Sequence, residues 1–145
     1  MIVCCSTVET PSHICYIDNG AFSHMSGVRE HFIDLKDPKI KLEIVLGDNT
    51  IVRVVGHGTV SFQRELMPPL VFRDVLYVPG LKKNLISVFS IQGMGFEVSF
   101  RGTEVLIHPK GSNITSDRVI GTREGNLYRL CFHPLHALAS SNNNS

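Results

Sequence analysis

One aspartate in this sequence stands where a carboxylate could do acid–base chemistry. Asp18 closes the apolar, β-branched run at residues 14–18 and is followed by Asn19 and Gly20. A strand of this kind fixes the acid at the floor of a cleft, and the glycine lets the backbone turn tightly beside it. A carboxylate held in this way can act as a general acid or base. The same residues also fit an ordinary Asp-Asn-Gly turn, which is common in β proteins.

The elements that must position this carboxylate are predicted to be mostly strands. Residues 41–46 alternate polar and apolar side chains, which is the pattern of a half-buried strand. Residues 47–50 tolerate the positive φ of a hairpin turn, and residues 51–55 return from it. Further strand runs are predicted at residues 59–62, 70–72, 74–78, 96–100, 104–107 and 127–130.

Loop and helix signals complete the expected fold. Residues 64–69 are predicted as a loop, because paired prolines cannot donate to a sheet ladder. One helix is predicted over residues 83–92, with Asn84 as its N-cap. Its buried face would consist of Leu85, Val88 and Ile91. Many short strands, Gly and Pro turns and one short helix predict a small, mainly β barrel.

The composition limits the classes of protein that this chain can represent. Its 145 residues fit one domain with a short tail, and 43% hydrophobic against 19% charged residues are ordinary for a globular protein. Fourteen basic and 13 acidic residues give a net charge of +1, so direct nucleic-acid binding is not expected. The longest apolar run is too short for a membrane span, and the start of the chain is a poor signal peptide.

Cysteine and histidine spacing predicts neither a disulfide framework nor a metal site. The four cysteines form no CxxC pair, which favours reduced thiols in an intracellular protein. His133 and His136 lie beside Cys131, but a second ligand pair is missing, so zinc is not expected. The cysteines are Cys4, Cys5, Cys15 and Cys131.

Longer segments carry a resemblance to a known family. The stretch YIDNGAFSHM at residues 16–25 resembles the start of the protease region of copia-type retrotransposon Pol polyproteins. The segment DVLYVPGLKKNLISV at residues 74–88 is similar to the same polyproteins and is long enough to be specific. Residues 121–130 look like the start of their pre-integrase segment. Shorter similar stretches lie at residues 46–49 and 55–60, and the match covers about residues 14–136.

The resemblance implies a retropepsin-like β-barrel that works as a homodimer. Each chain would contribute one aspartate, here Asp18, to a shared catalytic site beneath hairpin flaps. No cofactor or metal is implied, and the substrate would be the polyprotein or another peptide. The active-site loop then consists of Asn19, Gly20, Ala21 and Phe22, and the flap that covers the substrate of Leu46, Gly47, Asp48, Asn49 and Thr50.

The resemblance also divides the chain and places it in the cell. Residues 1–13 would be an N-terminal extension and residues 14–108 the barrel. Residues 109–136 would form a pre-integrase-like linker, followed by a disordered polar tail at residues 137–145. We expect an intracellular, cytoplasmic protein without membrane contact, with virus-like particles as a further compartment that the family implies.

Two departures from the family pattern leave alternatives open. Asn19 stands where the family has Ser or Thr, whose hydroxyl steadies the pair of aspartates, and Phe22 replaces a small polar residue. A degenerate or host-captured domain that dimerises or binds peptides without hydrolysis is therefore the alternative to an active aspartic endopeptidase. A monomeric spacer before integrase is a third reading. The intact Asp18-x-Gly20-Ala21 pattern favours the endopeptidase.

Overall fold

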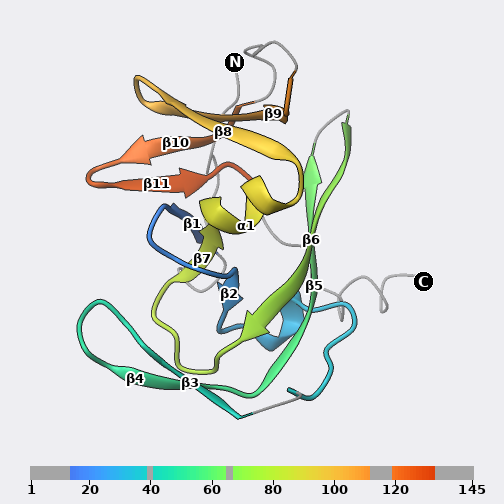
Figure 1. Cartoon of the computed structure of the whole chain (residues 1–145), viewed down its shortest axis with the longest axis vertical. Coiled ribbons are helices and arrows are strands. Elements are labelled where there is room, and N and C mark those ends of the chain that lie inside the picture. The colour runs from blue at the N-terminus through green and yellow to red at the C-terminus, as the bar shows by residue number, and fades with distance from the viewer. Residues whose placement is uncertain (1–13, 39–40, 65–66, 112–118, 133–145) are drawn as a thin grey trace.

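A computed structural model describes residues 14–38, 41–64, 67–111 and 119–132 of the chain. The expected N-terminal extension and the polar tail lie outside these residues. Figure 1 shows that strands dominate the described part, with one α-helix, α1 (Val88–Gly93), and a single 3₁₀ turn at Arg29–His31. The strands are β1 (Cys15–Asp18), β2 (Met25–Ser26), β3 (Leu42–Val45), β4 (Ile51–Val54), β5 (Gly56–Arg64), β6 (Met67–Tyr77), β7 (Asn84–Ser87), β8 (Phe96–Arg101), β9 (Glu104–Pro109), β10 (Val119–Glu124) and β11 (Leu127–Leu130).

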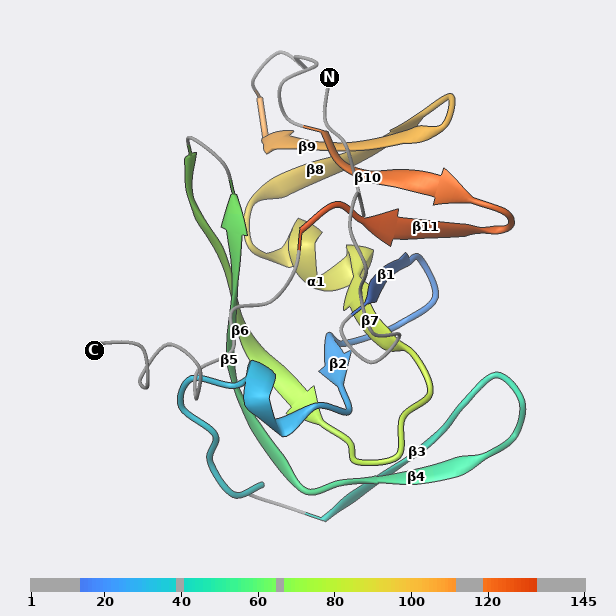
Figure 2. The same cartoon turned by 180° about the vertical axis from the view of Figure 1, so that it is seen from behind.

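The strands form one large sheet and one separate hairpin. The nine-stranded sheet has the order β5-β6-β2-β7-β1-β11-β10-β9-β8, and among the described strands β3 pairs only with β4. Strand β1 lies in the middle, parallel to β7 and antiparallel to β11. Figures 1 and 2 show the sheet curving around α1, while the β3–β4 hairpin projects from one end. The prediction of a small, mainly β barrel with one short α-helix is confirmed.

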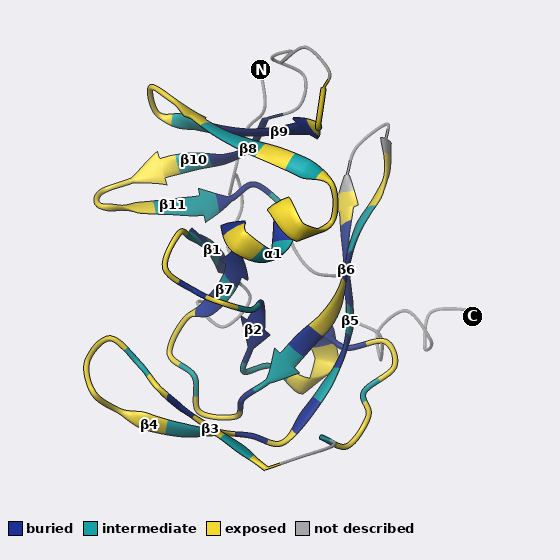
Figure 3. Cartoon of the chain, viewed as in Figure 1, coloured by how far each residue is buried: buried dark blue, intermediate teal, exposed yellow. Residues whose placement is uncertain are grey.

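Two apolar clusters stabilise these parts. The main cluster lies between the large sheet and α1 and includes Ile17 of β1, Ile86 of β7 and Ile91 of α1. A smaller cluster under the β3–β4 hairpin contains Met25, Ile44, Val54 and Val78. Figure 3 shows buried residues concentrated in the central strands and exposed residues at the hairpin tips.

The predicted helix at residues 83–92 is wrong in its first half. Asn84–Ser87 forms strand β7, which pairs in parallel with β1, and the helix begins only at Val88. Its N-cap is Ser87, whose hydroxyl accepts the Ser90 N–H at 3.0 Å. The Asn84 side chain instead accepts the Gly27 N–H and donates to the Ile14 carbonyl, each at 2.9 Å. A central position in the sheet therefore outweighs the helical spacing of the apolar residues.

The predicted loop at residues 64–69 is also too long. Strand β5 extends to Arg64 and β6 begins at Met67, so both prolines lie in a strand. The register between β5 and β6 shifts at this end, and β6 meets its other neighbour, β2, only at Leu76 and Tyr77. Prolines are tolerated at such an irregular edge, because no ladder hydrogen bond is needed from their nitrogens.

Other predictions agree with the described elements. The hairpins at residues 41–55 and 96–107 form as β3–β4 and β8–β9, and residues 127–130 form β11. Strand β10, in the range expected as a pre-integrase-like linker, was not predicted and joins the same large sheet. No helix in the described residues is long and apolar enough to cross a membrane.

The expectation of reduced thiols is wrong at Cys131, which is disulfide-bonded. Cys15 is free and buried in β1. Burial raises the pKa of its thiol to about 12, so this side chain packs in the core and does not act as a nucleophile.

Candidate functional site

Asp18 ends β1, so its position is fixed by the centre of the large sheet. Its neighbour on β7 is Ser87, in parallel register. The backbone then turns at once, and the Gly20 N–H donates a hydrogen bond of 2.7 Å to Asp18 Oδ1. This bond holds the carboxylate at the strand end.

The loop after Asp18 is tied to β7 and α1 through one serine. Ser87 is fully buried, and its hydroxyl donates to the Ala21 carbonyl at 2.7 Å. Its backbone N–H donates to His24 Nδ1 at 2.9 Å. The Ser90 hydroxyl adds a longer bond of 3.3 Å to the Phe22 carbonyl. Strand β7 therefore positions the loop at both ends: it pairs with Asp18 where the loop begins and bonds to Ala21 and His24 where the loop ends.

His24 takes part in this network as a neutral ring. Accepting the Ser87 N–H at Nδ1 requires the ring proton to sit on Nε2. Burial lowers the pKa of His24 from 6.5 to about 4, which keeps the ring neutral. The ring packs on Phe72 with centroids 4.6 Å apart. His24 is therefore structural and acts on the site only through the loop it holds.

A cavity of about 640 Å³ opens beside Asp18. Its described walls come from β1, β7, β8 and the β10–β11 turn region. Asp18 supplies the only carboxylate among these lining residues, and Lys83 the only basic group. Phe100 and Tyr128 pack edge to face at 4.9 Å in the same wall. The cavity is large enough for part of a peptide chain, but it contains one acid where a dyad needs two.

The residues predicted as a flap form the turn of the β3–β4 hairpin. The Leu46 N–H donates to the Thr50 carbonyl at 2.8 Å, and the Asn49 N–H donates to the Leu46 carbonyl at 2.9 Å. Asn49 has a φ of 67°, which this residue type tolerates. Asp48 caps the turn by accepting the Thr50 N–H at 3.0 Å. Hydrogen bonds from the side chain and then from the backbone of Thr50 lower the pKa of Asp48. Gly47 is exposed in the same turn.

The two departures from the family pattern are both at the surface. Asn19 is exposed, and within the described residues its side chain makes no hydrogen bond. Phe22 is 55% exposed and is not among the described residues that line the Asp18 cavity. Phe89 of α1, beside Ser90 that bonds the Phe22 carbonyl, is 68% exposed. An uncovered apolar surface therefore borders the Asp18 loop.

No metal centre is formed by the part of the chain that the structure describes. There, no group of three or more His, Cys, Asp or Glu side chains could hold an ion. His133 and His136 lie outside the described residues.

Comparison with known sequences identifies the family of this fold. A family described as "Pol polyprotein, beta-barrel domain" matches residues 15–96, which is more than half of the chain and spans the Asp18 loop, the β3–β4 hairpin and α1. The chain belongs to this family. The matched residues contain strands β1, β2, β5, β6 and β7 of the large sheet and the whole of the separate β3–β4 hairpin.

A curated relative places the domain in a retrotransposon. The chain is 26% identical over 125 residues to the "Retrovirus-related Pol polyprotein from transposon TNT 1-94" of Nicotiana tabacum. The alignment covers 86% of this chain and 9% of the relative, so the chain spans about a tenth of that polyprotein. No solved structure matches. The resemblance to the Pol polyprotein of copia-type retrotransposons is confirmed.

Sequence reasoning found the acid and the hairpin but missed Ser87, which anchors the loop after Asp18. Asp18 and Gly20 interact as their spacing suggests. Ser87 was hidden inside a segment predicted as helix, so its contacts with the loop could not be anticipated. A serine directly before an apolar helical run is the N-cap signal that could have moved the helix start to Val88.

Proposed function

We propose that this β-barrel domain is an aspartic endopeptidase that becomes complete when two copies pair. The observation that carries the proposal is the Asp18–Gly20 hydrogen bond at the end of a central strand, beside a peptide-sized cavity with no second acid in its described wall. A second copy would supply the missing carboxylate. The exposed Phe22 and Phe89 next to the loop support self-association, because apolar surface of this kind favours burial against a partner.

The chemistry requires the two Asp18 carboxylates to share one proton. Two such groups held close together cannot both ionise easily, so their pKa values separate. The ionised member takes a proton from a bound water, whose oxygen forms a bond to the peptide carbonyl carbon. The protonated member gives its proton to the carbonyl oxygen. The tetrahedral intermediate then collapses and the C–N bond breaks. The protonated member of the dyad gives its proton to the leaving amine, and one hydroxyl of the intermediate gives its proton to the ionised member, which restores the shared proton.

The test is cleavage of a mixed peptide library at mildly acidic pH, with Asp18→Asn as the inactive variant. We expect cleavage by the unaltered protein, inhibition by a transition-state-like aspartic protease inhibitor, and loss of at least about 10³-fold in the variant. Asp37→Asn, which changes an exposed aspartate outside the cavity and outside the predicted flap, is the matched control and should retain activity. Cleavage that survives Asp18→Asn would refute the assignment.

A second candidate function, peptide binding or dimerisation without hydrolysis, is favoured by Asn19 and Phe22. The amide of Asn19 is larger than a hydroxyl and lies free at the surface where two copies would meet. Sedimentation separates the candidates: a dimer that cleaves nothing supports this second function. Restoring activity with Asn19→Ser and Phe22→Ser together would show that only the site had decayed.

A further inference from the structure

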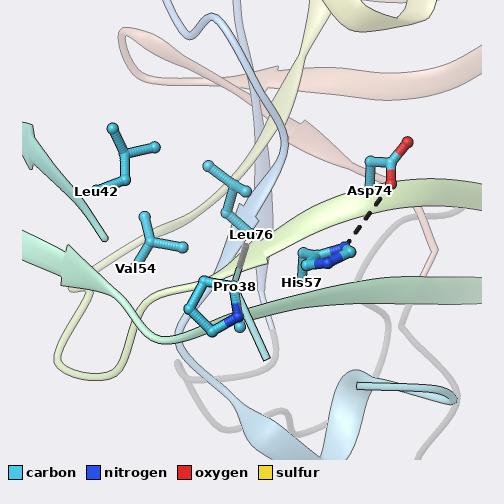
Figure 4. Close-up of a pocket in the computed structure, with 7 residues that line it drawn as sticks. Pro38, Leu42, Val54, His57, Asp74 and Leu76 are labelled. Carbon is cyan, nitrogen blue, oxygen red and sulfur yellow. Dashed lines mark ion pairs between the residues drawn. The ribbon is translucent and has the colours of Figure 1, made fainter. Parts of the chain in front are cut away.

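A second cavity lies at the base of the β3–β4 hairpin and shares no lining residue with the Asp18 cavity. Its volume is about 290 Å³. Figure 4 shows it between the hairpin strands and the β5–β6 pair. We call it the hairpin-base groove, and its side chains are Pro38, Leu42, Val54, His57, Asp74 and Leu76.

The groove has an apolar end and an acidic end. Leu42, Val54 and Leu76 gather on one side, and all three belong to or pack against the cluster under the hairpin. His57 and Asp74 occupy the other side (Figure 4). A ligand that matches both ends needs an apolar stem and a cationic head.

The Asp74 carboxylate can accept further hydrogen bonds. Its side chain is 90% exposed, and its contact within the described residues is Oδ1 to His57 Nδ1 at 3.8 Å. That separation is too long for a hydrogen bond, so the carboxylate lone pairs remain open to a donor.

The backbone holds Asp74 in an unusual conformation. Its φ is 58°, in the left-handed region that few residues other than glycine adopt. The register of β5 against β6 shifts between Gly58 and Val60, so Asp74 lies in an irregular stretch of β6. Irregularities of this kind re-aim side chains and are frequent next to binding sites. Here the irregularity places a carboxylate on the same face as His57 and Leu76.

The opposite wall is built by an unusually close backbone approach. Lys36 exchanges two backbone hydrogen bonds with His57, at 2.8 and 2.9 Å. A Cβ on Gly56 would lie only 2.8 Å from the Lys36 carbonyl oxygen, so this approach requires a glycine. The Gly-His-Gly sequence at residues 56–58 thereby fixes His57 in the groove and brings Pro38 over it.

We propose that the hairpin-base groove binds an arginine or lysine side chain of a partner peptide. Pockets for whole small molecules usually exceed about 300 Å³, so a groove of this volume suits a single long side chain. The methylenes lie against Leu42, Val54 and Leu76, and the cationic head bonds to Asp74. Charge complementarity selects this occupant over an apolar one, because a cationic head is attracted to the Asp74 carboxylate and an apolar head is not.

The experiment is a titration of the whole chain, followed by ¹⁵N–¹H spectra, with N-acetyl-arginine amide as the probe. N-acetyl-citrulline amide is the matched neutral probe, because it keeps the shape and loses the charge. We expect arginine amide to shift the amide signals of Gly56, His57 and Leu76 and to bind about two- to fivefold more tightly than citrulline amide, because Asp74 is exposed. Equal affinity for the two probes, or no shifts at these residues, would overturn the proposal.

Variants localise the binding. Asp74→Asn should weaken arginine binding about two- to fivefold while keeping the fold, because asparagine tolerates the same positive φ. Glu30→Gln removes an exposed carboxylate outside the groove and should leave the affinity unchanged. Asp18→Asn should also leave it unchanged, so the result does not depend on the proposed endopeptidase activity. Unaltered binding in a folded Asp74→Asn variant would contradict the assignment, and if that variant does not fold, the two-probe comparison decides.

Discussion

Strand β1 and the β3–β4 hairpin differ in how firmly the fold holds them. Strand β1 is hydrogen-bonded on both edges and rests on a cluster of fourteen buried residues. The hairpin pairs only with itself and rests on a cluster of four. Regions with fewer buried contacts open at lower free energy. The carboxylate therefore sits on the rigid part of the domain and its proposed cover on the part that can move, which is the arrangement a peptide-binding cleft needs.

Truncating the main cluster should have the largest effect. Phe62 is fully buried and meets Phe72 edge to face at 5.5 Å, so Phe62→Ala should lower the free energy of unfolding by about 3–5 kcal/mol. Ile44→Ala, under the hairpin, should cost about 2 kcal/mol, because a small cluster next to solvent can close around the gap. Urea unfolding measures both. A larger loss of unfolding free energy in Ile44→Ala than in Phe62→Ala would mean that the hairpin is held more firmly than β1.

Acidic pH should destabilise the part of the domain around β1 through protonation of His24. Burial lowers the pKa of His24 to about 4, whereas the unfolded chain binds this proton below about pH 6.5. The unfolded state thus holds more protons between these values, and the free energy of unfolding should fall as pH drops from 6.5 to 4, by about 3 kcal/mol in all.

Urea unfolding at several pH values, with His24→Gln as the control, measures this effect. Glutamine can still accept the Ser87 N–H but does not titrate, so its curve should be flatter over the same range. Equal slopes for the two proteins would mean that His24 is not the group responsible.

A pair of glycines compares the two regions directly. A Cβ at Gly121 of β10 would lie 2.6 Å from Ile17 Cδ1 and 2.8 Å from the Arg129 carbonyl oxygen. Gly121→Ala should therefore destabilise the domain by about 1–3 kcal/mol. Gly47, in the hairpin turn, has nothing within 4 Å and no positive φ, so Gly47→Ala should be nearly neutral. Thermal unfolding of the two variants should separate them clearly, and a similar loss in both would count against a loosely packed turn.

The smallest effect is expected at the hairpin tip. Val45 and Ile51 are paired across the hairpin and are each 63% exposed. Val45→Thr and Ile51→Thr should each change the free energy of unfolding by less than about 0.5 kcal/mol. Differential scanning calorimetry can measure this. A loss above 1 kcal/mol would show that the tip is packed.

The sequence predicted those features that local spacing determines. Alternation in residues 41–46 and the turn residues after it are enough to define β3–β4, and the strand before Asp18 is marked by its β-branched run. Asp18 and Gly20 could be paired in advance because they are two residues apart.

Features that depend on distant partners could not be predicted. The segment Asn84–Ser87 has helical spacing, and only its place between β1 and β2 makes it a strand. The role of Ser87 follows from that placement. The hairpin-base groove likewise depends on Asp74, Lys36 and His57 meeting in space, and a single sequence carries no signal for such a meeting.

The pairing of β1 with β11 has a consequence for synthesis of the protein. The aspartate lies near the start of the described chain, and the strand that covers one edge of β1 lies near its end. During translation, this edge of β1 stays uncovered until almost the whole domain has left the ribosome. Contacts so distant in sequence also form slowly. The proposed protease would thus stay inactive on a nascent polyprotein until residues beyond the family barrel had been translated.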